Sequence, residues 1–259
     1  VLFVDVYKIN AVWEEKIKAS TDKLFVIDDL ANRDHYTDYI IDQNAGRTET
    51  DYKIYNLNRG KILSGTRFAI INQDIADYRD KALSIRKKIN NKNILINFGS
   101  SSHESLYSQF IKSLISNGDM QGKSISLLSS NKTSNEFKDL LDSLKVRLLT
   151  SLSPIELAKL YISSDFCIGA GGVSALERCC LGLPSGVVCI AENQYPGSVQ
   201  LEKKGCIKLL NNFPDLTVSI NIIKNLLNDD NQLKELSINS LNEVDGNGLK
   251  RILSEVESA

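Results

Sequence analysis

Histidine is scarce in this 259-residue sequence, C-x-x-C pairs are absent and no long apolar run occurs. No cluster of histidine, cysteine and carboxylate residues stands at metal-ligand spacing, so no metal site is predicted and no cofactor is expected. The longest apolar stretches have the length of a strand, well short of the roughly 20 residues that a membrane span needs. These shortages argue against a metalloenzyme and against a protein with a membrane-spanning helix.

An excess of one charge is also lacking, because 31 lysines and arginines stand against 32 aspartates and glutamates, a formal net charge of −1. Without a polybasic run, nothing indicates a nucleic-acid partner. The cysteines are odd in number and lie in or beside apolar runs, which is typical of reduced core thiols in a cytoplasmic protein. They are Cys167, Cys179, Cys180, Cys189 and Cys206. The sequence leaves the oligomeric state open.

Residues 1–75 are predicted to form the C-terminal part of a first Rossmann-like domain. Short strands are expected at 1–4, 23–27 and 39–41, with a helix over 11–19. Because the sequence starts directly in an apolar strand, we expect this first domain to be incomplete. The charged, helix-prone stretch 76–92 is interpreted as the connection to a second domain.

Residues 93–259 show a regular alternation of strands and helices. Strands are expected at 94–98, 125–128, 146–149, 166–168, 186–190 and 207–210, with helices between them and helices at the end. Strands that alternate with helices at short spacing indicate a parallel sheet covered on both faces. The predicted fold is therefore α/β and doubly wound, with a complete second domain.

The clearest chemical signal is the glycine loop Gly169-Ala-Gly171-Gly172-Val173-Ser174, which follows a buried strand and precedes a helix. Glycines allow a ligand to approach the backbone closely, and the start of a helix offers free N–H groups and a positive dipole end to a phosphate. Ser174 can donate a hydrogen bond to a phosphate oxygen. Glu177, one turn later, can accept hydrogen bonds from two ribose hydroxyls.

Two other interpretations of this loop remain open at the level of the pattern. Ser174 and Glu177 have the spacing of a capping box, in which the glycines only make a tight turn. Gly169-x-Gly171-x-x-Ser174 is also close to a dinucleotide-binding fingerprint. That fingerprint normally lies in the first βαβ unit of its domain, whereas this loop follows the fourth predicted strand.

A second loop of small residues, Gly99-Ser100-Ser101-Ser102, follows the first strand of the same domain. In an open parallel sheet, ligands bind beyond the carboxyl ends of the strands near the point where the strand order reverses. Two such loops in one sheet therefore favour a binding site, although a serine-rich helix cap would also explain the second loop.

Residues 166–184, from Phe166 to Pro184, resemble the nucleotide-sugar hydrolase family of pseudaminic acid biosynthesis, to which spore-coat polysaccharide proteins also belong. Further stretches resemble the family's D-x-Y, I-D-D-L-A-x-R-x-H, D-Q-N, N-Q and D-G-x-G-x-x-R motifs. They are residues 5–7, 27–35, 42–44, 193–194 and 245–251. The resemblance thus covers nearly the whole chain and implies a GT-B fold with a UDP-sugar as the small-molecule partner.

The resemblance also implies an activity, in which water attacks the anomeric carbon of a UDP-linked diacetamido-trideoxyhexose and UDP leaves. The implied UDP-binding residues are Gly99, Ser100, Leu152, Gly171, Gly172, Val173, Ser174 and Glu177, with Leu152 against the uracil and Glu177 on the ribose. Asn193 and Gln194 would bind the sugar. Tyr7 and Asp5, from the first domain, would face the reacting centre as catalytic residues.

The family's N-terminal G-x-G-H loop, which carries its expected catalytic histidine, has no counterpart here. His35 matches a different family position, and we interpret it as a surface or strand-end residue. The pair Asp28-Asp29 is interpreted as a turn. Three functions stay open: a UDP-sugar hydrolase, a GT-B glycosyltransferase related to the lipid II-forming GlcNAc transferase, and a non-catalytic nucleotide-sugar-binding remnant.

Overall fold

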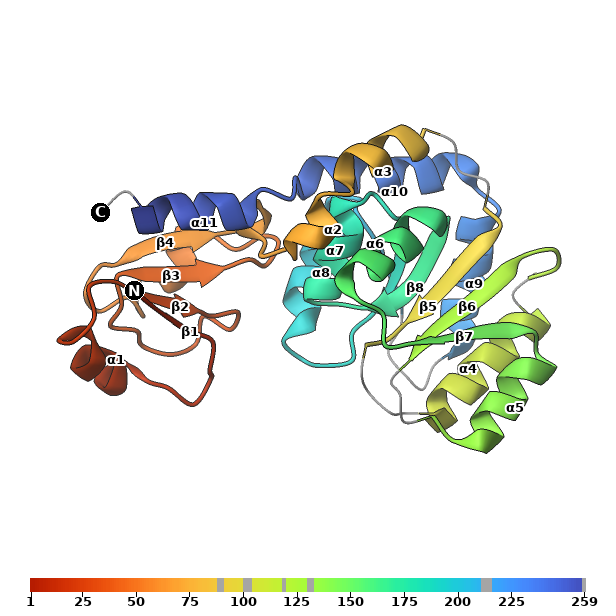
Figure 1. Cartoon of the computed structure of the whole chain (residues 1–259), viewed down its shortest axis with the longest axis horizontal. Coiled ribbons are helices and arrows are strands. Elements are labelled where there is room, and N and C mark those ends of the chain that lie inside the picture. Colours follow the sequence, from red (N-terminus) through yellow and green to blue (C-terminus); the bar gives the residue numbers. More distant parts are fainter. Residues whose placement is uncertain (88–90, 100–103, 118–119, 130–132, 211–215, 258–259) are drawn as a thin grey trace. The chain divides into compact units, whose positions relative to one another are not determined.

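The computed structural model describes residues 1–87, 91–99, 104–117, 120–129, 133–210 and 216–257 (Figure 1). The chain divides into two compact units. The first contains Val1–Ile71 together with Asp245–Ala259, and the second contains Asn72–Val244. Each unit is built on its own parallel sheet, as the sequence predicts.

The first unit has a four-stranded sheet in chain order, β1-β2-β3-β4. Its strands are β1 (Leu2–Val4), β2 (Leu24–Ile27), β3 (Tyr39–Asp42) and β4 (Lys61–Ser64). Helix α1 (Ala11–Lys18) follows β1, and two short 3-10 helices follow β3 and β4, η1 (Glu49–Tyr52) and η2 (Thr66–Phe68). The sequence predicted the first three strands but missed β4, because only two consecutive residues of this strand, Ile62 and Leu63, are apolar.

The last helix, α11 (Gly248–Glu257), belongs to the first unit, so the predicted domain 93–259 is wrong at its C-terminal end. Ile252 is buried in a cluster with Phe25, Ile41 and Leu63 of the first sheet. Lys61 of β4 also pairs with Glu255, with Nζ 2.7 Å from Oε1. Figure 1 shows α11, in dark blue, lying along this sheet. Long-range burial thus returns the end of the chain to the unit in which the chain begins.

The motif Asp245-Gly-Asn-Gly-Leu-Lys-Arg251 makes this return possible. Arg251 forms an ion pair with Asp245, and its Nη1 donates to the carbonyl of Arg67 at 2.7 Å. Gly248 packs so closely on η2 that an added Cβ would lie 2.2 Å from the carbonyl oxygen of Ala69. The motif therefore attaches the start of α11 to the end of the first sheet.

The second unit has a six-stranded sheet in the order β10-β9-β8-β5-β6-β7, with all neighbouring strands parallel. The strands are β5 (Asn93–Asn97), β6 (Ser124–Ser129), β7 (Val146–Thr150), β8 (Phe166–Ala170), β9 (Ser185–Val188) and β10 (Lys208–Leu209). The chain winds outward from β5 in one direction through β7 and then from β8 in the other. This is the predicted doubly wound arrangement.

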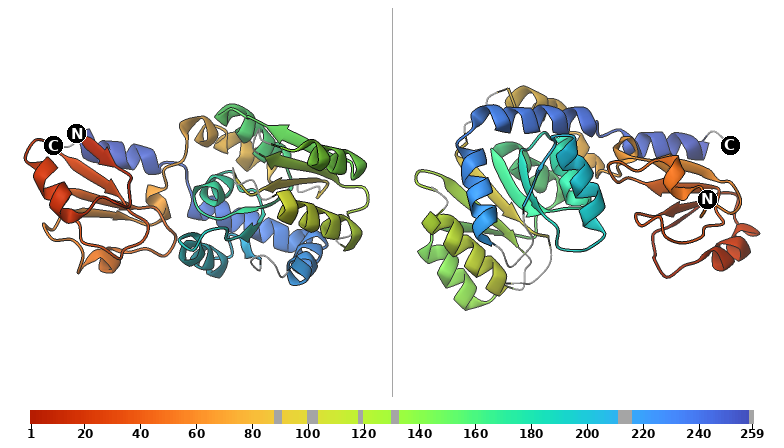
Figure 2. Two further views of the ribbon diagram at one scale, coloured as in Figure 1. Left: turned by 90° about the horizontal axis from the view of Figure 1, so that it is seen from below. Right: turned by 180° about the vertical axis from the view of Figure 1, so that it is seen from behind.

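Helices cover both faces of this sheet (Figures 1 and 2). Helices α4 (Glu104–Asn117), α5 (Asn135–Ser143) and α9 (Leu216–Leu227) pack on one face. The others are α2 (Gln73–Ala76), α3 (Arg79–Ile85), α6 (Pro154–Ser163), α7 (Val173–Cys180), α8 (Gln194–Lys203) and α10 (Asp230–Glu243). Helix α8 contains the Pro196-Gly197 pair in its first turn.

The predicted connection 76–92 is part of the second unit rather than a separate segment. Arg86, at the end of α3, is buried and donates hydrogen bonds to the carbonyls of Tyr161, Ser164 and Leu181. Arg79 likewise donates to carbonyls of α7 and α10. These arginines hold α3 on the second unit, which the charged sequence of the stretch did not indicate.

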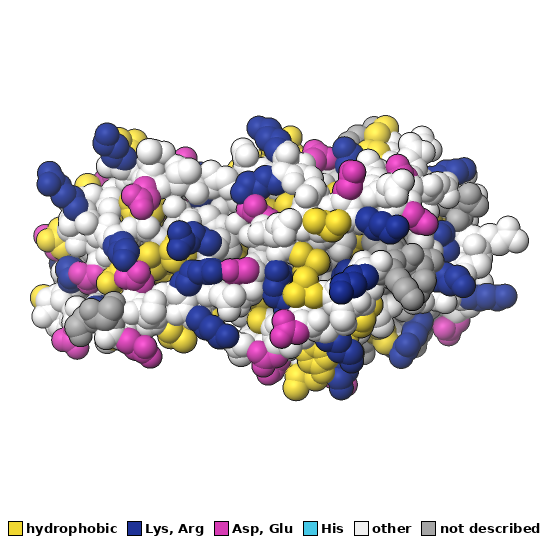
Figure 3. All heavy atoms as spheres, turned by 90° about the horizontal axis from the view of Figure 1, so that it is seen from above, with side chains coloured by type: hydrophobic (Ala, Val, Ile, Leu, Met, Phe, Trp, Pro, Cys, Tyr) yellow, Lys and Arg dark blue, Asp and Glu magenta, His cyan; other side chains and the backbone are white. Residues whose placement is uncertain are grey.

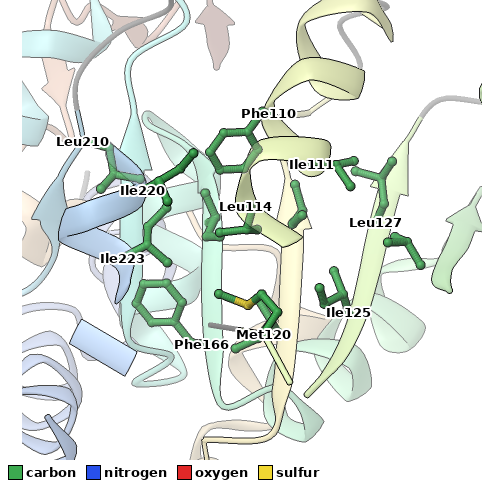
Figure 4. Close-up of a cluster of buried hydrophobic side chains, with 14 of the residues drawn as sticks. Phe110, Ile111, Leu114, Met120, Ile125, Leu127, Phe166, Leu210, Ile220 and Ile223 are labelled. Atoms are coloured by element: carbon green, nitrogen blue, oxygen red, sulfur yellow. The ribbon is translucent and has the colours of Figure 1, made fainter. Parts of the chain in front are cut away.

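A large core cluster fills the face of the second sheet under α4, α5 and α9 (Figure 4). Phe110, Ile111 and Leu114 of α4 meet Ile125 and Leu127 of β6. Phe166 of β8 and Ile220 and Ile223 of α9 extend the same cluster. All these side chains are buried, so the sheet has a rigid base from which its loops project.

The surface carries charges of both signs. On the face that Figure 3 shows, Lys and Arg side chains are interspersed with Asp and Glu, and no field of one sign forms there. A nucleic-acid footprint would require clustered basic side chains, which this face lacks. None of the helices in the described part of the chain combines the length and apolar character that a bilayer crossing requires.

Candidate functional site

The two predicted small-residue loops leave neighbouring strands of the second sheet. β5 pairs with β8, and Asn97 is opposite Gly169 in the register. Because β5 also pairs with β6, the order of strands reverses between β5 and β8. Parallel sheets bind ligands beyond the carboxyl ends of the strands at such a switch point. Gly99 and Gly171 therefore lie at the edge of the sheet where a ligand is expected.

The glycine loop is a sharp strand-to-helix turn. β8 ends at Ala170 and α7 begins at Val173, with Gly172 as the N-cap residue at φ +68°. The left-handed backbone of Gly172 favours glycine. The first hydrogen bond at the start of α7 runs from Ala175 N to the carbonyl of Gly172, at 3.0 Å. The backbone N–H groups of Val173 and Ser174 come before this first hydrogen bond. At the start of a helix such groups point away from the helix body.

The capping-box interpretation of Ser174 and Glu177 is wrong. The N-cap residue is Gly172, no side chain caps this helix, and Ser174 lies one residue inside it. Ser174 and Glu177 are three residues apart on one helix face, and both are half-buried. Their side chains therefore remain available for a ligand in front of the helix.

Gln194 packs directly against the glycine loop. A Cβ added to Gly171 would lie 3.1 Å from the Cβ of Gln194 and 2.9 Å from the Oγ of Ser198. The side-chain Oε1 of Gln194 accepts a hydrogen bond from the backbone N–H of Ile190, at 3.0 Å. Close packing at this point therefore requires a glycine at position 171. The predicted diphosphate loop and Gln194, a predicted sugar-binding residue, thus adjoin each other. Asn193 is half-buried at the N-cap of α8.

A cleft of about 670 Å³ opens beside this loop at the end of β9. Its lining residues are Cys189, Ile190, Ala191, Glu192 and Tyr195. Ile190 and Tyr195 are exposed, which gives the cleft an apolar and aromatic wall, and Glu192 adds a carboxylate. A pocket of this size and composition suits a small polar ligand with apolar substituents.

The other predicted UDP-binding residues are distributed along the same edge. Leu152 is half-buried in the loop between β7 and α6, where Ser153 and Glu156 form a capping box. The ends of β7 and β8 are three strand spacings apart, about 14 Å. Gly99 is exposed at φ +77° just beyond β5, and Val173 is exposed at the start of α7. Ser100 lies outside the described residues.

Glu177 has an unusual electrostatic environment. Burial raises the pKa of its carboxyl group, and the guanidinium of Arg178 acts in the opposite direction. A half-buried carboxylate binds sugar hydroxyls more strongly than an exposed one, because water competes less for its oxygens. The sequence analysis did not single out Arg178. Its place in the largely apolar stretch Ala175–Pro184 was nevertheless a signal of a buried charge.

Tyr7 and Asp5 lie in the first unit, just beyond β1, and both are exposed. The Tyr7 hydroxyl donates a hydrogen bond to Asp29, with Oη 2.8 Å from Oδ1. The guanidinium of Arg33 lies over the Tyr7 ring, 5.8 Å from its centroid. The structure thus pairs Tyr7 with a carboxylate that the sequence assigned only to a turn.

Behind this pair, the carboxyl edge of the first sheet holds a buried polar network. The Tyr52 hydroxyl lies 2.9 Å from Asp28 Oδ2 and 2.8 Å from Asp42 Oδ2. Arg47 pairs with Asp42 through Nε at 2.7 Å, and Nη2 donates to the carbonyl of Asp29 at 3.0 Å. The network thereby fixes the turn that presents Asp29 to Tyr7.

The prediction that His35 is a surface or strand-end residue is wrong. Its side chain is fully buried, with Nδ1 2.9 Å from Glu14 Oε1 and Nε2 3.8 Å from Asp28 Oδ1. Carboxylates from α1 and from the end of β2 surround the imidazole, so burial is compensated by charge pairing. A lone histidine in a polar sequence stretch carried no signal of these two distant partners.

No group of three or more histidine, cysteine or carboxylate side chains in the described ranges is arranged to hold a metal ion. The five cysteines are buried and none forms a disulfide, as the sequence predicted. Burial raises the pKa of Cys167 and Cys179 to about 11, so these thiols are protonated at neutral pH.

No protein-family model matches the chain, and no curated protein shows significant similarity to it. Solved structures do match. MurG of Acinetobacter baumannii superposes with a TM-score of 0.64 at 12% identity, over 96% of this chain and 70% of MurG. The UDP-GlcNAc 2-epimerase of Neisseria meningitidis bound to UDP-GlcNAc gives 0.62 at 15% identity, over 96% of this chain and 80% of the epimerase.

Anabaena HepE in complex with UDP matches with a TM-score of 0.59 at 14% identity, over 99% of this chain and 79% of HepE. Likeness at such identities shows the fold. The chain has a GT-B-like fold with two parallel-sheet units, as the sequence predicted.

Proposed function

We propose that this chain binds a UDP-sugar and hydrolyses it at the anomeric carbon, releasing UDP. The observation that carries the proposal is the glycine loop at the switch point of the second sheet, with Gly172 at positive φ and the half-buried Ser174 and Glu177 on one face of α7. Solved structures of the same fold include UDP and UDP-sugar complexes, which supports a uridine nucleotide as the ligand.

In the proposed complex, the N–H groups of Gly172, Val173 and Ser174 bind the diphosphate at the start of α7. Glu177 accepts hydrogen bonds from the ribose, and Leu152 contacts the uracil from the end of β7. Gly99 flanks the diphosphate from the end of the neighbouring strand. Asn193 and Gln194 bind the sugar beside the cleft at the end of β9, whose apolar wall suits the methyl groups of a diacetamido-trideoxyhexose.

The chemistry needs a stabilised leaving group and an activated water. Negative charge develops on the departing diphosphate, and preorganised N–H donors stabilise it without rearrangement. The sugar becomes oxocarbenium-like, and water attacks the anomeric carbon from the opposite face. Tyr7 and Asp5 are the proposed catalytic residues. The hydrogen bond between Tyr7 and Asp29 orients the phenol, and the carboxylate can accept a proton through it.

The same nucleotide site would serve a GT-B glycosyltransferase, in which a hydroxyl group replaces water. The likeness to WaaG, a glycosyltransferase involved in lipopolysaccharide biosynthesis, favours this as the second candidate (TM-score 0.51 at 14% identity). A non-catalytic nucleotide-sugar-binding protein is the third, and it would bind UDP without turnover. The five buried cysteines that form no disulfide support the proposed cytoplasmic location.

Titration of the full chain with UDP by calorimetry tests the binding site. Glu177→Ala is expected to weaken UDP binding by about 1–3 kcal/mol, roughly 5- to 150-fold, because a charged hydrogen bond to the ribose is lost. Glu136→Ala, at an exposed position of α5, is the control and should leave the affinity unchanged. Equal UDP affinity of Glu177→Ala and the parent chain would exclude this assignment.

Release of UDP from a UDP-diacetamido-trideoxyhexose distinguishes the three functions. A hydrolase releases UDP in buffer alone, a transferase requires an acceptor, and a binding protein releases none. For a hydrolase, Tyr7→Phe should lower kcat and leave the affinity for UDP unchanged.

A further inference from the structure

Arg178 is a fully buried charge at the back of the glycine loop. It lies in α7 directly after Glu177, and its side chain is the largest fully buried one in the described part of the chain. Burying a guanidinium in a protein interior is costly unless hydrogen bonds and an opposite charge compensate it. The contacts of Arg178 therefore indicate the role of its buried charge.

Two nitrogen atoms of the Arg178 guanidinium group form hydrogen bonds to the end of β8 and the start of β9. Nη2 donates to the carbonyl of Ala170 at 2.6 Å, and Nε donates to Oγ of Ser185 at 3.1 Å. Ala170 is the last residue of β8 and Ser185 the first of β9. The peptide that joins Ala170 to Gly171 is tied at its other end as well, because Gly171 N donates to the carbonyl of Val188 at 3.3 Å.

The third nitrogen atom, Nη1, makes no hydrogen bond of acceptable geometry within the described ranges. It lies against Gly169, where an added Cβ would be 3.0 Å away. No carboxylate forms an ion pair with Arg178 in the described part of the chain. Glu177 is the neighbouring acid, and its carboxyl is only half-buried at the ligand side of the helix. The positive charge behind the loop is thus not neutralised by a buried partner.

We propose that Arg178 is the positioning residue of the diphosphate subsite. Its guanidinium fixes the Ala170–Gly171 peptide so that the following N–H groups face the ligand, and its unneutralised charge stabilises the diphosphate from behind the loop. Arg178 does not touch the ligand, because it is fully buried. This inference rests on the proposed function, in which the loop binds the diphosphate of UDP.

Affinities for UDP and for uridine separate this role from a general structural one. Loss of Arg178 should weaken the binding of UDP, which carries the diphosphate, and leave uridine nearly unaffected. A merely structural role would weaken both ligands together. We therefore expect Arg178→Gln to lower the ratio of UDP affinity to uridine affinity at least tenfold, measured by calorimetry for UDP and by ligand-observed NMR for uridine.

Matched variants complete the experiment. Arg178→Lys keeps the charge but loses the paired contacts, so the ratio should lie between the parent and Arg178→Gln. Ser185→Ala removes the acceptor of Nε, together with the hydrogen bond that the hydroxyl donates to the carbonyl of Leu183, and should lower the ratio about threefold. Arg86→Gln is the control, because Arg86 is also a buried arginine bonded to backbone carbonyls of the second unit and should leave the ratio unchanged.

An unchanged ratio in Arg178→Gln and Arg178→Lys overturns the inference. If both variants fail to fold, an unchanged ratio in Ser185→Ala overturns it. Should Glu177→Ala lower UDP affinity while the Arg178 variants keep the parent ratio, the proposed function stands and only the role of Arg178 fails. Should the parent chain bind no UDP, both are overturned.

Discussion

Glu14 Oε1 lies 2.9 Å from His35 Nδ1 inside the first unit, and both side chains are fully buried. The second carboxylate oxygen of Glu14 accepts a hydrogen bond from Tyr36 N at 2.6 Å, which anchors it. Burial disfavours the imidazolium, but the interactions with Asp28 and Glu14 outweigh it and raise the pKa of His35 above its ordinary value. A protonated His35 therefore stabilises the first unit.

The stability of the first unit should fall as the pH rises above about 6.5. A raised pKa means that the stabilisation is fully present below the ordinary value and is lost as the pH rises through the folded pKa, with a slope of about 1.4 kcal/mol per pH unit. Urea unfolding followed by fluorescence measures it, because Trp13 is the only tryptophan and lies in α1. The variant His35→Gln should lack this pH dependence; an identical profile would contradict the charged pair.

The Tyr52 hydroxyl has one proton for two carboxylates, Asp28 and Asp42. Burial raises the pKa of Asp42 to about 6, whereas hydrogen bonds and the Arg33 charge overcome burial and lower the pKa of Asp28 to about 2. Tyr52→Phe leaves both buried acids without this donor, so the free energy of unfolding at pH 7 should fall by about 1–3 kcal/mol.

The control for this substitution is Tyr55→Phe, on a half-buried tyrosine three residues later. It should change the free energy of unfolding by less than about 0.5 kcal/mol. Equal effects of the two substitutions would show that the Tyr52 hydroxyl does not support the network.

Gly172→Ala should lower UDP affinity at least tenfold. An alanine at φ +68° costs about 1–2 kcal/mol and turns the N–H groups of the loop away from the diphosphate. Gly122→Ala is the matched control, because Gly122 has φ +75° with no atom within 4 Å of an added Cβ. Both variants should lose similar stability, but only Gly172→Ala should lose affinity for UDP.

Ile252→Ala should destabilise the first unit by about 2–4 kcal/mol, since Ile252 is buried against Phe25, Ile41 and Leu63. Leu253→Ala, at the next and exposed position, should have little effect. Unfolding followed by Trp13 fluorescence reports on this unit. An unaffected transition in Ile252→Ala would contradict the assignment of α11 to the first sheet.

Local patterns predicted most of the second unit. Strands of a parallel sheet are buried on both faces, so each reads as a short apolar run such as Ile94–Phe98, and the helices between them follow from spacing. The glycine loop was also recognisable from a local pattern. The positive φ of Gly172 and the helix start after it depend on adjacent residues.

Local sequence patterns did not predict the contacts between residues that lie far apart in the chain. The apolar side of α11 could have packed on either sheet, and its place is decided by Ile252 and by the Arg251 contacts with Asp245 and Arg67. Likewise, the burial of His35 depends on Glu14 and Asp28, which lie 21 and 7 residues away in the chain.

The sequence by itself determined the two parallel sheets, the glycine loop and the candidate residues beyond the strand ends, because apolar runs and glycines act over a few residues. Only the tertiary structure decided that the loops of β5 and β8 adjoin, that Asp29 bonds Tyr7, and that Arg178 is buried behind the loop. The physical reason is that burial and charge pairing join residues far apart in the chain, and their partners are selected by packing rather than by sequence spacing.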